Sequence, residues 1–189
     1  NVNGTGVHKG LPAVVVGIDG RNDVAVLRLA TSDETEYEDL LEHPHIEFGD
    51  SLRTEIGENI WMVGDPLAVD YRSIAAGTVR DNKFIDDAHA TPETMWLDCS
   101  AYSGNSGSMV VNAQNKVVSM LTWSFGDNSS GGGPPQHLIE KSFRYILAQY
   151  AAQYPSGPPP PTLPPFPIMY PKAFLGLEVM PLLLITGTL

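Results

Sequence analysis

Short apolar runs, each closed by turn-forming residues, fill the N-terminal part of this 189-residue chain. Each run is rich in β-branched or aromatic residues and is bounded by Gly, Asn, Asp or Ser, which is typical of β-strands. The runs lie at residues 13–16, 24–29, 59–63, 71–79, 95–98, 109–112 and 117–123. No long helical period appears before about residue 135, so the sequence predicts an all-β barrel or sandwich.

A single amphipathic helix is predicted near the C-terminus. Apolar residues recur there at helical spacing, namely Leu138, Ile139, Phe143, Ile146, Leu147 and Tyr150. One face of this helix should pack on the β core.

The last 35 residues have a different composition. Nine prolines occupy the 17 positions of 155–171, which forbids a helix or a central strand and favours an extended polyproline-like linker. We therefore expect a domain over residues 1–154, a Pro-rich linker over 155–171 and an apolar tail over 172–189. Glu178 and Pro181 interrupt that tail, so docking on a partner or on the barrel is favoured over a membrane span.

Charge and cysteine content exclude several classes of function. The formal net charge is −11 and the pI about 4.7, so the chain offers no phosphate-neutralising face and nucleic acid is not expected as a partner. Cys99 is the only cysteine, cannot form an intrachain disulfide and is predicted to be buried. No signal-peptide pattern follows Asn1, and the start is interpreted as processed or truncated. The cellular compartment stays open.

The acidic segment 33–50 holds eight of the 22 Asp and Glu residues and no Lys or Arg. It is interpreted as a solvated surface loop, with cation binding as the alternative. His43 and His45 belong to this loop. Two imidazoles without a regular element beneath them are more typical of a solvated loop than of a metal site, so no metal and no cofactor is expected.

The most specific local pattern is Ser103-Gly104-Asn105-Ser106-Gly107-Ser108, placed directly before the predicted strand at 109–112. A serine flanked by glycines on a tight turn can expose its hydroxyl while neighbouring backbone N–H groups converge on one point, as an oxyanion hole requires. Gly and Ser are also the residues of ordinary turns, so the string alone leaves a structural role open.

Four stretches in matching order resemble the chymotrypsin-like (PA clan) serine peptidases, and within them the HtrA/DegP-like branch. They are Val15–Asp19 leading to Asn22–Leu29, then Gly57–Leu67, then Ala76–Val79, and finally Leu97–Asp98 through Gly104–Ser108 to Val117–Trp123. The resemblance implies two β-barrels with the active site between them and a C-terminal helix. For this chain it implies an all-β, chymotrypsin-like double β-barrel whose first barrel is incomplete.

The resemblance also assigns catalytic roles to individual residues. Ser106 becomes the nucleophile, the N–H groups of Gly104 and Ser106 form the oxyanion hole, and Asp23 is the triad acid. A serine hydroxyl needs a histidine to remove its proton, and a carboxylate holds that histidine in the useful tautomer. Read without the resemblance, Asp23 is a turn aspartate.

Substrate contacts follow from the same resemblance. Thr122, Trp123 and Ser124 match the segment along which the family lays its peptide substrate as an added strand. Ser100 matches the base of the primary specificity pocket, where the lack of a carboxylate favours apolar or aromatic substrate residues. Core packing is the alternative role for Trp123.

Three positions depart from the family pattern. Ser108 replaces a glycine, which could alter the turn, and Asn105 replaces the acid that anchors a newly cut N-terminus in digestive trypsins. The third departure is the catalytic histidine, since only His8 precedes Asp23, by 15 residues, and it does not match. We expect that histidine upstream of Asn1.

The sequence therefore predicts a serine endopeptidase acting on polypeptides through an acyl-enzyme at Ser106. The alternative is a catalytically inactive protease-like domain that serves as a binding or structural module. A third hypothesis is that Pro158–Pro161 recruits a partner with an aromatic-lined groove. The oligomeric state is left open.

Overall fold

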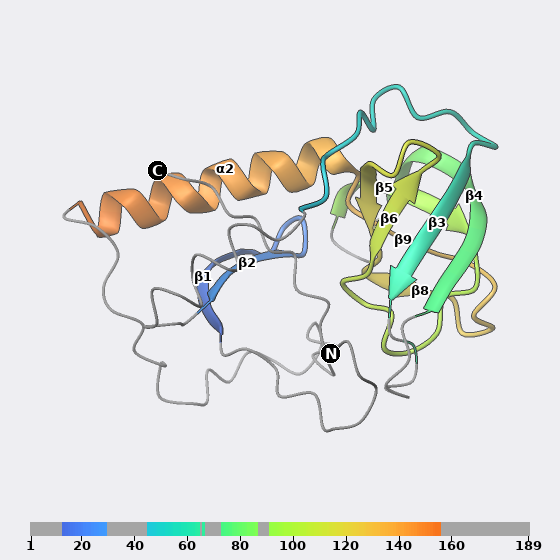
Figure 1. Ribbon diagram of the computed structural model, residues 1–189, viewed down its shortest axis with the longest axis horizontal. Coiled ribbons are helices and arrows are strands. Elements are labelled where there is room, and N and C mark those ends of the chain that lie inside the picture. The colour runs from blue at the N-terminus through green and yellow to red at the C-terminus, as the bar shows by residue number, and fades with distance from the viewer. Residues whose placement is uncertain (1–12, 30–44, 65, 67–72, 87–90, 156–189) are drawn as a thin grey trace.

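The computed structural model describes residues 13–29, 45–64, 66, 73–86 and 91–155 (Figure 1). The Pro-rich linker and the apolar tail lie outside the described residues, apart from Pro155. The elements are β1 (Ala13–Asp19), β2 (Val24–Leu29), β3 (Asn59–Gly64), β4 (Ser73–Asp86), β5 (Thr91–Asp98), β6 (Met109–Asn112), β7 (Val117–Met120), β8 (Trp123–Ser124), β9 (Gly131–Gly133) and α2 (Gln136–Gln153). The predicted mostly-β architecture with one C-terminal helix is confirmed.

Seven strands form one curled, antiparallel sheet in the order β7-β6-β3-β4-β5-β9-β8. Its concave side holds the core because alternate residues of β3 and β5 point inward. Ile60, Met62, Met95 and Leu97 are each at most 1% exposed. Burial of each such side chain contributes about 1.5–3 kcal/mol, which makes this sheet the stable body of the molecule.

Strand β9 was not predicted. The sequence interpretation used Gly131–Pro135 only as the break before the helix, whereas the structure pairs Gly131–Gly133 with both β5 and β8. A Cβ at Gly132 would lie 2.7 Å from the Met95 carbonyl oxygen, and one at Gly133 would collide with the Met120 carbonyl oxygen. Glycine is needed here because neighbouring backbones approach these positions closely. A strand of glycines has no alternation of apolar and polar residues, so the sequence pattern did not reveal it.

A two-stranded hairpin of β1 and β2 packs on α2, away from the curled sheet (Figure 1). Gly17 lies against the helix so closely that a Cβ there would be 2.7 Å from a side-chain carbon of Ile146. The Ser142 hydroxyl donates to the Asp19 carboxylate at 2.7 Å, and the Asn22 amide donates to the same carboxylate at 2.9 Å. The helix thus joins the hairpin to the barrel.

Helix α2 begins at Gln136 without a capping side chain of its own, because Pro135 precedes it. Ser51, distant in sequence, takes that role by accepting the backbone N–H of His137 at 3.1 Å. Within the described part of the chain, no helix is long and apolar enough to cross a membrane.

Candidate active site

Ser106 lies on an exposed double turn between β5 and β6. The N–H of Asn105 donates to the Tyr102 carbonyl oxygen at 3.0 Å, and the N–H of Ser108 donates to the Asn105 carbonyl oxygen at 2.9 Å. Two consecutive four-residue turns therefore meet at Asn105. The second of them holds Ser106 at its second position, where the residue is exposed to solvent.

Two glycines make the double turn possible. Gly104 has a φ of 93° and Gly107 a φ of 85°, and each is the third residue of its turn. A type II turn requires a positive φ at that position, which glycine adopts without steric cost. The Gly-Asn-Ser-Gly sequence thereby fixes the backbone on both sides of Ser106.

In the described part of the chain, hydrogen bonding leaves the backbone donors of Gly104 and Ser106 free. The Gly107 N–H donates to the Leu121 carbonyl oxygen at 2.7 Å, and the Asn105 N–H is used within the turn. Among the described residues, the N–H groups of Gly104 and Ser106 have no acceptor. Free donors beside an exposed hydroxyl are suited to stabilise an oxyanion.

The double turn rests on the end of β3. Asn105 and Ser108 are at most 1% exposed, and their Oδ1 and Oγ atoms are buried without a hydrogen-bond partner among the described residues. Gly64 faces both: a Cβ there would lie 2.8 Å from Asn105 Oδ1 and would overlap Ser108 Oγ. The serine at position 108 therefore fits because position 64 has no side chain.

Gly131 is tightly packed near the double turn, where a Cβ would lie 2.5 Å from the Trp123 carbonyl oxygen. A Cβ at Gly131 would lie 3.1 Å from the Ala101 Cβ and 2.8 Å from a methyl carbon of Leu121. Ala101 is fully buried and donates its N–H to the Asn128 carbonyl oxygen at 3.1 Å. Ser100, the predicted pocket residue, precedes it and is exposed.

The predicted substrate segment forms the edge of the sheet. The Thr122 N–H donates to the Gly132 carbonyl oxygen at 2.8 Å, and β8 is the last strand of the seven. Trp123 is 9% exposed and packs on the rings of Trp96 and Phe125, while Ser124 is exposed. Leu121, directly before this segment, binds the double turn, so the two predicted site segments are neighbours.

Cys99 is buried in the core, as predicted. Burial, and then the neighbouring charge of Asp98, raise the pKa of its thiol to about 11. The thiol is protonated at neutral pH and is no candidate nucleophile.

Asp23 lies at the tip of the turn between β1 and β2, with a φ of 54°. Its side chain is exposed, yet the surrounding protein excludes enough water to raise the pKa of the carboxyl group. No hydrogen bond or ion pair joins it to Ser106 or to an imidazole in the described part of the chain.

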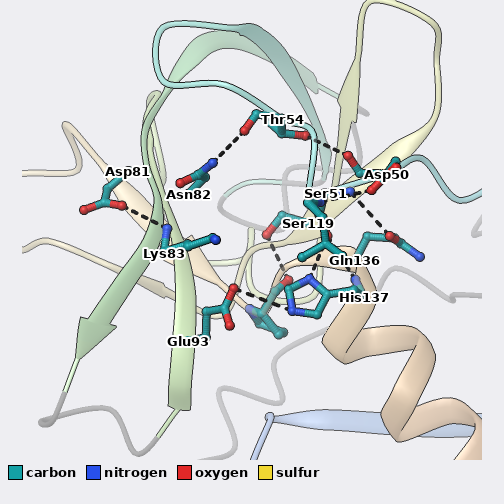
Figure 2. A network of polar contacts seen from close by, with 12 residues as sticks. Asp50, Ser51, Thr54, Asp81, Asn82, Lys83, Glu93, Ser119, Gln136 and His137 are labelled. Carbon is teal, nitrogen blue, oxygen red and sulfur yellow. Dashed lines mark hydrogen bonds and ion pairs between the residues drawn. The ribbon is translucent and has the colours of Figure 1, made fainter.

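Two of the five histidines, His45 and His137, belong to the described residues; His8, His43 and His89 lie outside them. His137 is held by other groups: its Nδ1 is 2.9 Å from Ser51 Oγ and its Nε2 is 3.6 Å from a Glu93 oxygen (Figure 2). Neither described imidazole is bonded to Ser106 or Asp23.

The Ser51, His137 and Glu93 side chains have the residue types of a catalytic triad, but their geometry is structural. Ser51 is 3% exposed, and its hydroxyl oxygen already accepts the first-turn N–H of the helix. In a serine peptidase the hydroxyl faces Nε2, whereas here it faces Nδ1. This network anchors α2 to the barrel. No group of three potential metal ligands occurs in the described ranges.

A sequence profile of the trypsin-like peptidase domain matches residues 1–120. The chain belongs to the trypsin-like peptidase family. A serine protease described as HtrA-like from Staphylococcus aureus is 29% identical over 127 residues, which are 60% of this chain and 15% of that protein. The chain thus spans a minor part of this curated relative.

Solved structures of HtrA-type proteases share the fold. The protease AlgW with a decapeptide superposes with a TM-score of 0.63 at 20% identity, over 74% of this chain and 42% of that one. AlgW with a tripeptide gives a TM-score of 0.62 at 20% identity, over 72% and 44% of the two chains. The expected chymotrypsin-like fold of the HtrA branch is confirmed.

Sequence reasoning missed two residues that shape the candidate site of this member of the trypsin-like peptidase family. From the sequence, Gly64 was interpreted as the residue that ends a strand, and Gly131 as part of the break before the helix. The position of Gly64 directly after an apolar strand was the only sequence signal for it. Its contact with Ser108 could not be predicted because the two residues are far apart in the chain.

Proposed function

We propose that this chain carries the nucleophile, oxyanion hole and triad acid of a serine endopeptidase. The observation that carries the proposal is the pair of free N–H groups at Gly104 and Ser106, beside the exposed Ser106 hydroxyl. Asp23 would orient a histidine supplied from upstream of Asn1. The peptidase domain would end with α2, near Tyr154, followed by the Pro-rich linker and the apolar tail.

In the first step the Ser106 Oγ attacks the carbonyl carbon of the scissile peptide bond while the histidine takes the hydroxyl proton. The carbonyl oxygen becomes an oxyanion that the Gly104 and Ser106 N–H groups stabilise. The histidine then gives its proton to the leaving amine, the C–N bond breaks, and an ester on Ser106 remains. Water, deprotonated by the same histidine, hydrolyses this ester and restores the serine. An oxyanion donor of this kind contributes about 3–4 kcal/mol to lowering the barrier.

Polypeptides are the proposed substrates. Thr122–Ser124 lie at β8, the last of the seven strands of the sheet among the described residues, and an end position suits an extended peptide that adds as a further strand. Ser100, at the predicted base of the specificity pocket, carries no carboxylate, which suits an uncharged substrate side chain. The presence of peptides in the AlgW structures supports the same class of substrate.

An inactive binding module is the second candidate. It is favoured by one observation: within the described residues Asp23 is exposed and no imidazole contacts it or Ser106. Such a module could bind peptides along β8 without cleaving them.

Labelling with a fluorophosphonate separates the two candidates, because the reagent forms a covalent bond only with an activated serine. The chain is expressed with its native upstream sequence, together with Ser106→Ala and with Ser103→Ala as a matched serine control. We expect labelling of the parent and of Ser103→Ala, and none of Ser106→Ala. An extended chain that binds peptide but takes no label would support the inactive module.

A further inference from the structure

Four aromatic rings form a continuous cluster at the β8 end of the curled sheet. This aromatic cluster consists of Phe84, Trp96, Trp123 and Phe125. The ring centroids of Phe84 and Trp96 are 4.7 Å apart, those of Trp96 and Phe125 5.4 Å, and those of Trp123 and Phe125 5.3 Å. The guanidinium of Arg80 lies 4.4 Å from the centre of the Trp96 ring.

The cluster lies on the outer face of the sheet. Trp96 stands between Met95 and Leu97, which both point into the core, so its ring points outward. The register places Trp96 opposite Gly132, and Gly132 opposite Trp123, so both indoles share that face. Phe125 is 44% exposed, and Phe84 and Trp96 are partly exposed. Exposed apolar patches of this kind mark interaction sites.

We propose that the aromatic cluster binds the distal part of this chain's own Pro-rich segment, residues 164–167 (Pro-Pro-Phe-Pro). Aromatic surfaces recognise polyproline segments because such segments are already extended, lose little entropy on binding and present flat pyrrolidine rings to the aromatic faces. This surface shares Trp123 with the proposed substrate segment but does not include Ser106. The inference therefore does not depend on the proposed peptidase activity.

The length of chain after α2 selects residues 164–167 over 158–161. At a rise of 1.5 Å per residue, the 18-residue helix carries the chain about 27 Å from Gln136. Gln136 is itself four residues after Gly132, which underlies the cluster, and β8 and β9 lie beyond the N-terminal end of α2, away from its C-terminal end (Figure 1). The tail must therefore return roughly 27–40 Å. At about 3.1 Å per residue, residues 158–161 reach less than about 20 Å beyond Pro155, whereas residues 164–167 reach about 28–37 Å.

The charges of the two partners are compatible. Residues 155–189 contain one cation and one anion, Lys172 and Glu178, in a chain with a net charge of −11. At the cluster, Arg80 is paired with Asp98 at 3.0 Å. Because the tail itself is nearly neutral, contact with the cluster brings little charge repulsion.

Tryptophan fluorescence of the full chain tests the proposal. A Trp61→Phe background leaves Trp96 and Trp123 as the only tryptophans. Replacing Pro164, Pro165 and Pro167 with alanine should red-shift the emission and increase quenching by acrylamide, because the indoles become exposed. The matched variant, with Pro158, Pro159 and Pro160 replaced by alanine, should match the parent. Identical behaviour of both variants would overturn the proposal, as would a parent spectrum that changes on dilution, which would point to a second copy as the occupant.

Limited trypsin digestion tests the same contact by following the tail instead of the tryptophans of the cluster. Lys172 lies five residues after the docking segment, so docking should slow cleavage at that site and the release of residues 173–189, measured by mass spectrometry. Phe125→Ser should accelerate this cleavage, while Tyr145→Ser, at a position 57% exposed on α2, should not. Equal cleavage rates in the parent and in Phe125→Ser would contradict docking on the cluster.

Discussion

At the scale of single residues, the double turn at Ser106 depends on the absence of a side chain at position 64. Ser108 replaces a smaller residue of the family pattern, and its hydroxyl occupies the space over Gly64. The two positions form a matched pair, since each limits the size of the other. The expected weakening of the turn by Ser108 therefore has to be judged together with position 64.

Gly64→Ala should destabilise the protein. The new methyl group would overlap Ser108 Oγ and press on Asn105, and overpacking of this kind typically costs about 1–3 kcal/mol. Ser108→Gly in the same chain should recover part of that loss. Urea unfolding of the parent, the two single variants and the double variant measures the coupling.

Gly20→Ala is the control for this cycle. A Cβ at Gly20 would meet nothing within 4 Å, and its φ is not in the left-handed region. Its unfolding free energy should stay within about 0.5 kcal/mol of the parent. Simple additivity of the Gly64 and Ser108 effects would show that the two positions are independent.

At the scale of elements, the hairpin is attached to α2 by a titratable contact. Burial alone would raise the pKa of Asp19, but hydrogen bonds from the Ser142 hydroxyl, the Arg21 N–H and the Asn22 amide outweigh it and lower the pKa. This contact therefore stabilises the fold fully above the ordinary Asp pKa of about 4, and the stabilisation is lost as the pH falls through the lower pKa of the folded state.

Ser142→Ala should cost about 1–2 kcal/mol at neutral pH, because it removes the 2.7 Å bond to Asp19 and an acceptor for the Asn22 amide. The difference from the parent should shrink as the pH falls below the ordinary Asp pKa of about 4 and through the lower pKa of the folded state. Urea unfolding followed by circular dichroism at neutral and at acid pH measures it. Ser124→Ala, an exposed serine, should have no effect at either pH, and a Ser142→Ala deficit unchanged by acid would exclude Asp19 as the titrating partner.

Local sequence patterns predicted most of the helices and strands. Contacts between residues far apart in the chain explain the elements that the sequence did not predict. Alternating apolar residues located β3 and β5, and the glycines at 104 and 107 located the double turn. The predicted strand at 117–123 instead divides into β7 and β8, because Thr122 turns to donate to Gly132. Strand β9 has no alternating apolar pattern in the sequence. Its glycines are required by close contacts with the backbone of residues distant in the chain.

The predicted catalytic residues also fall into a part that local sequence specifies and a part that it does not. The backbone turns at Ser106 follow from the glycines at 104 and 107 and could be predicted from the local sequence, whereas the fit of Ser108 against Gly64 could not. A triad joins residues from distant parts of a fold, and no spacing in the sequence specifies how Asp23 approaches Ser106. The roles of Asp23, Ser100 and Thr122–Ser124 stay predictions.

At the scale of the whole molecule, α2 connects two bodies of unequal stability. The curled sheet has its own core around Ile60 and Leu97, whereas the two-stranded hairpin has no comparable core among the described residues. An isolated two-stranded hairpin is marginally stable in water, so β1 and β2 depend on the helix face that carries Ile146.

Ile146→Ala should therefore release the hairpin selectively. Ile146 is 3% exposed and packs against Gly17, and loss of a buried Ile side chain costs about 2–5 kcal/mol. Hydrogen exchange should become faster in β1 and β2 while β3, β5 and β6 keep their protection, because the hairpin opens without unfolding the barrel. Tyr145→Ala, on the exposed side of the helix, should leave both regions unchanged. If the hairpin and the barrel lost protection together, the two bodies would be one cooperative unit, and the Asp23 carboxylate would be held as firmly as the Ser106 turn.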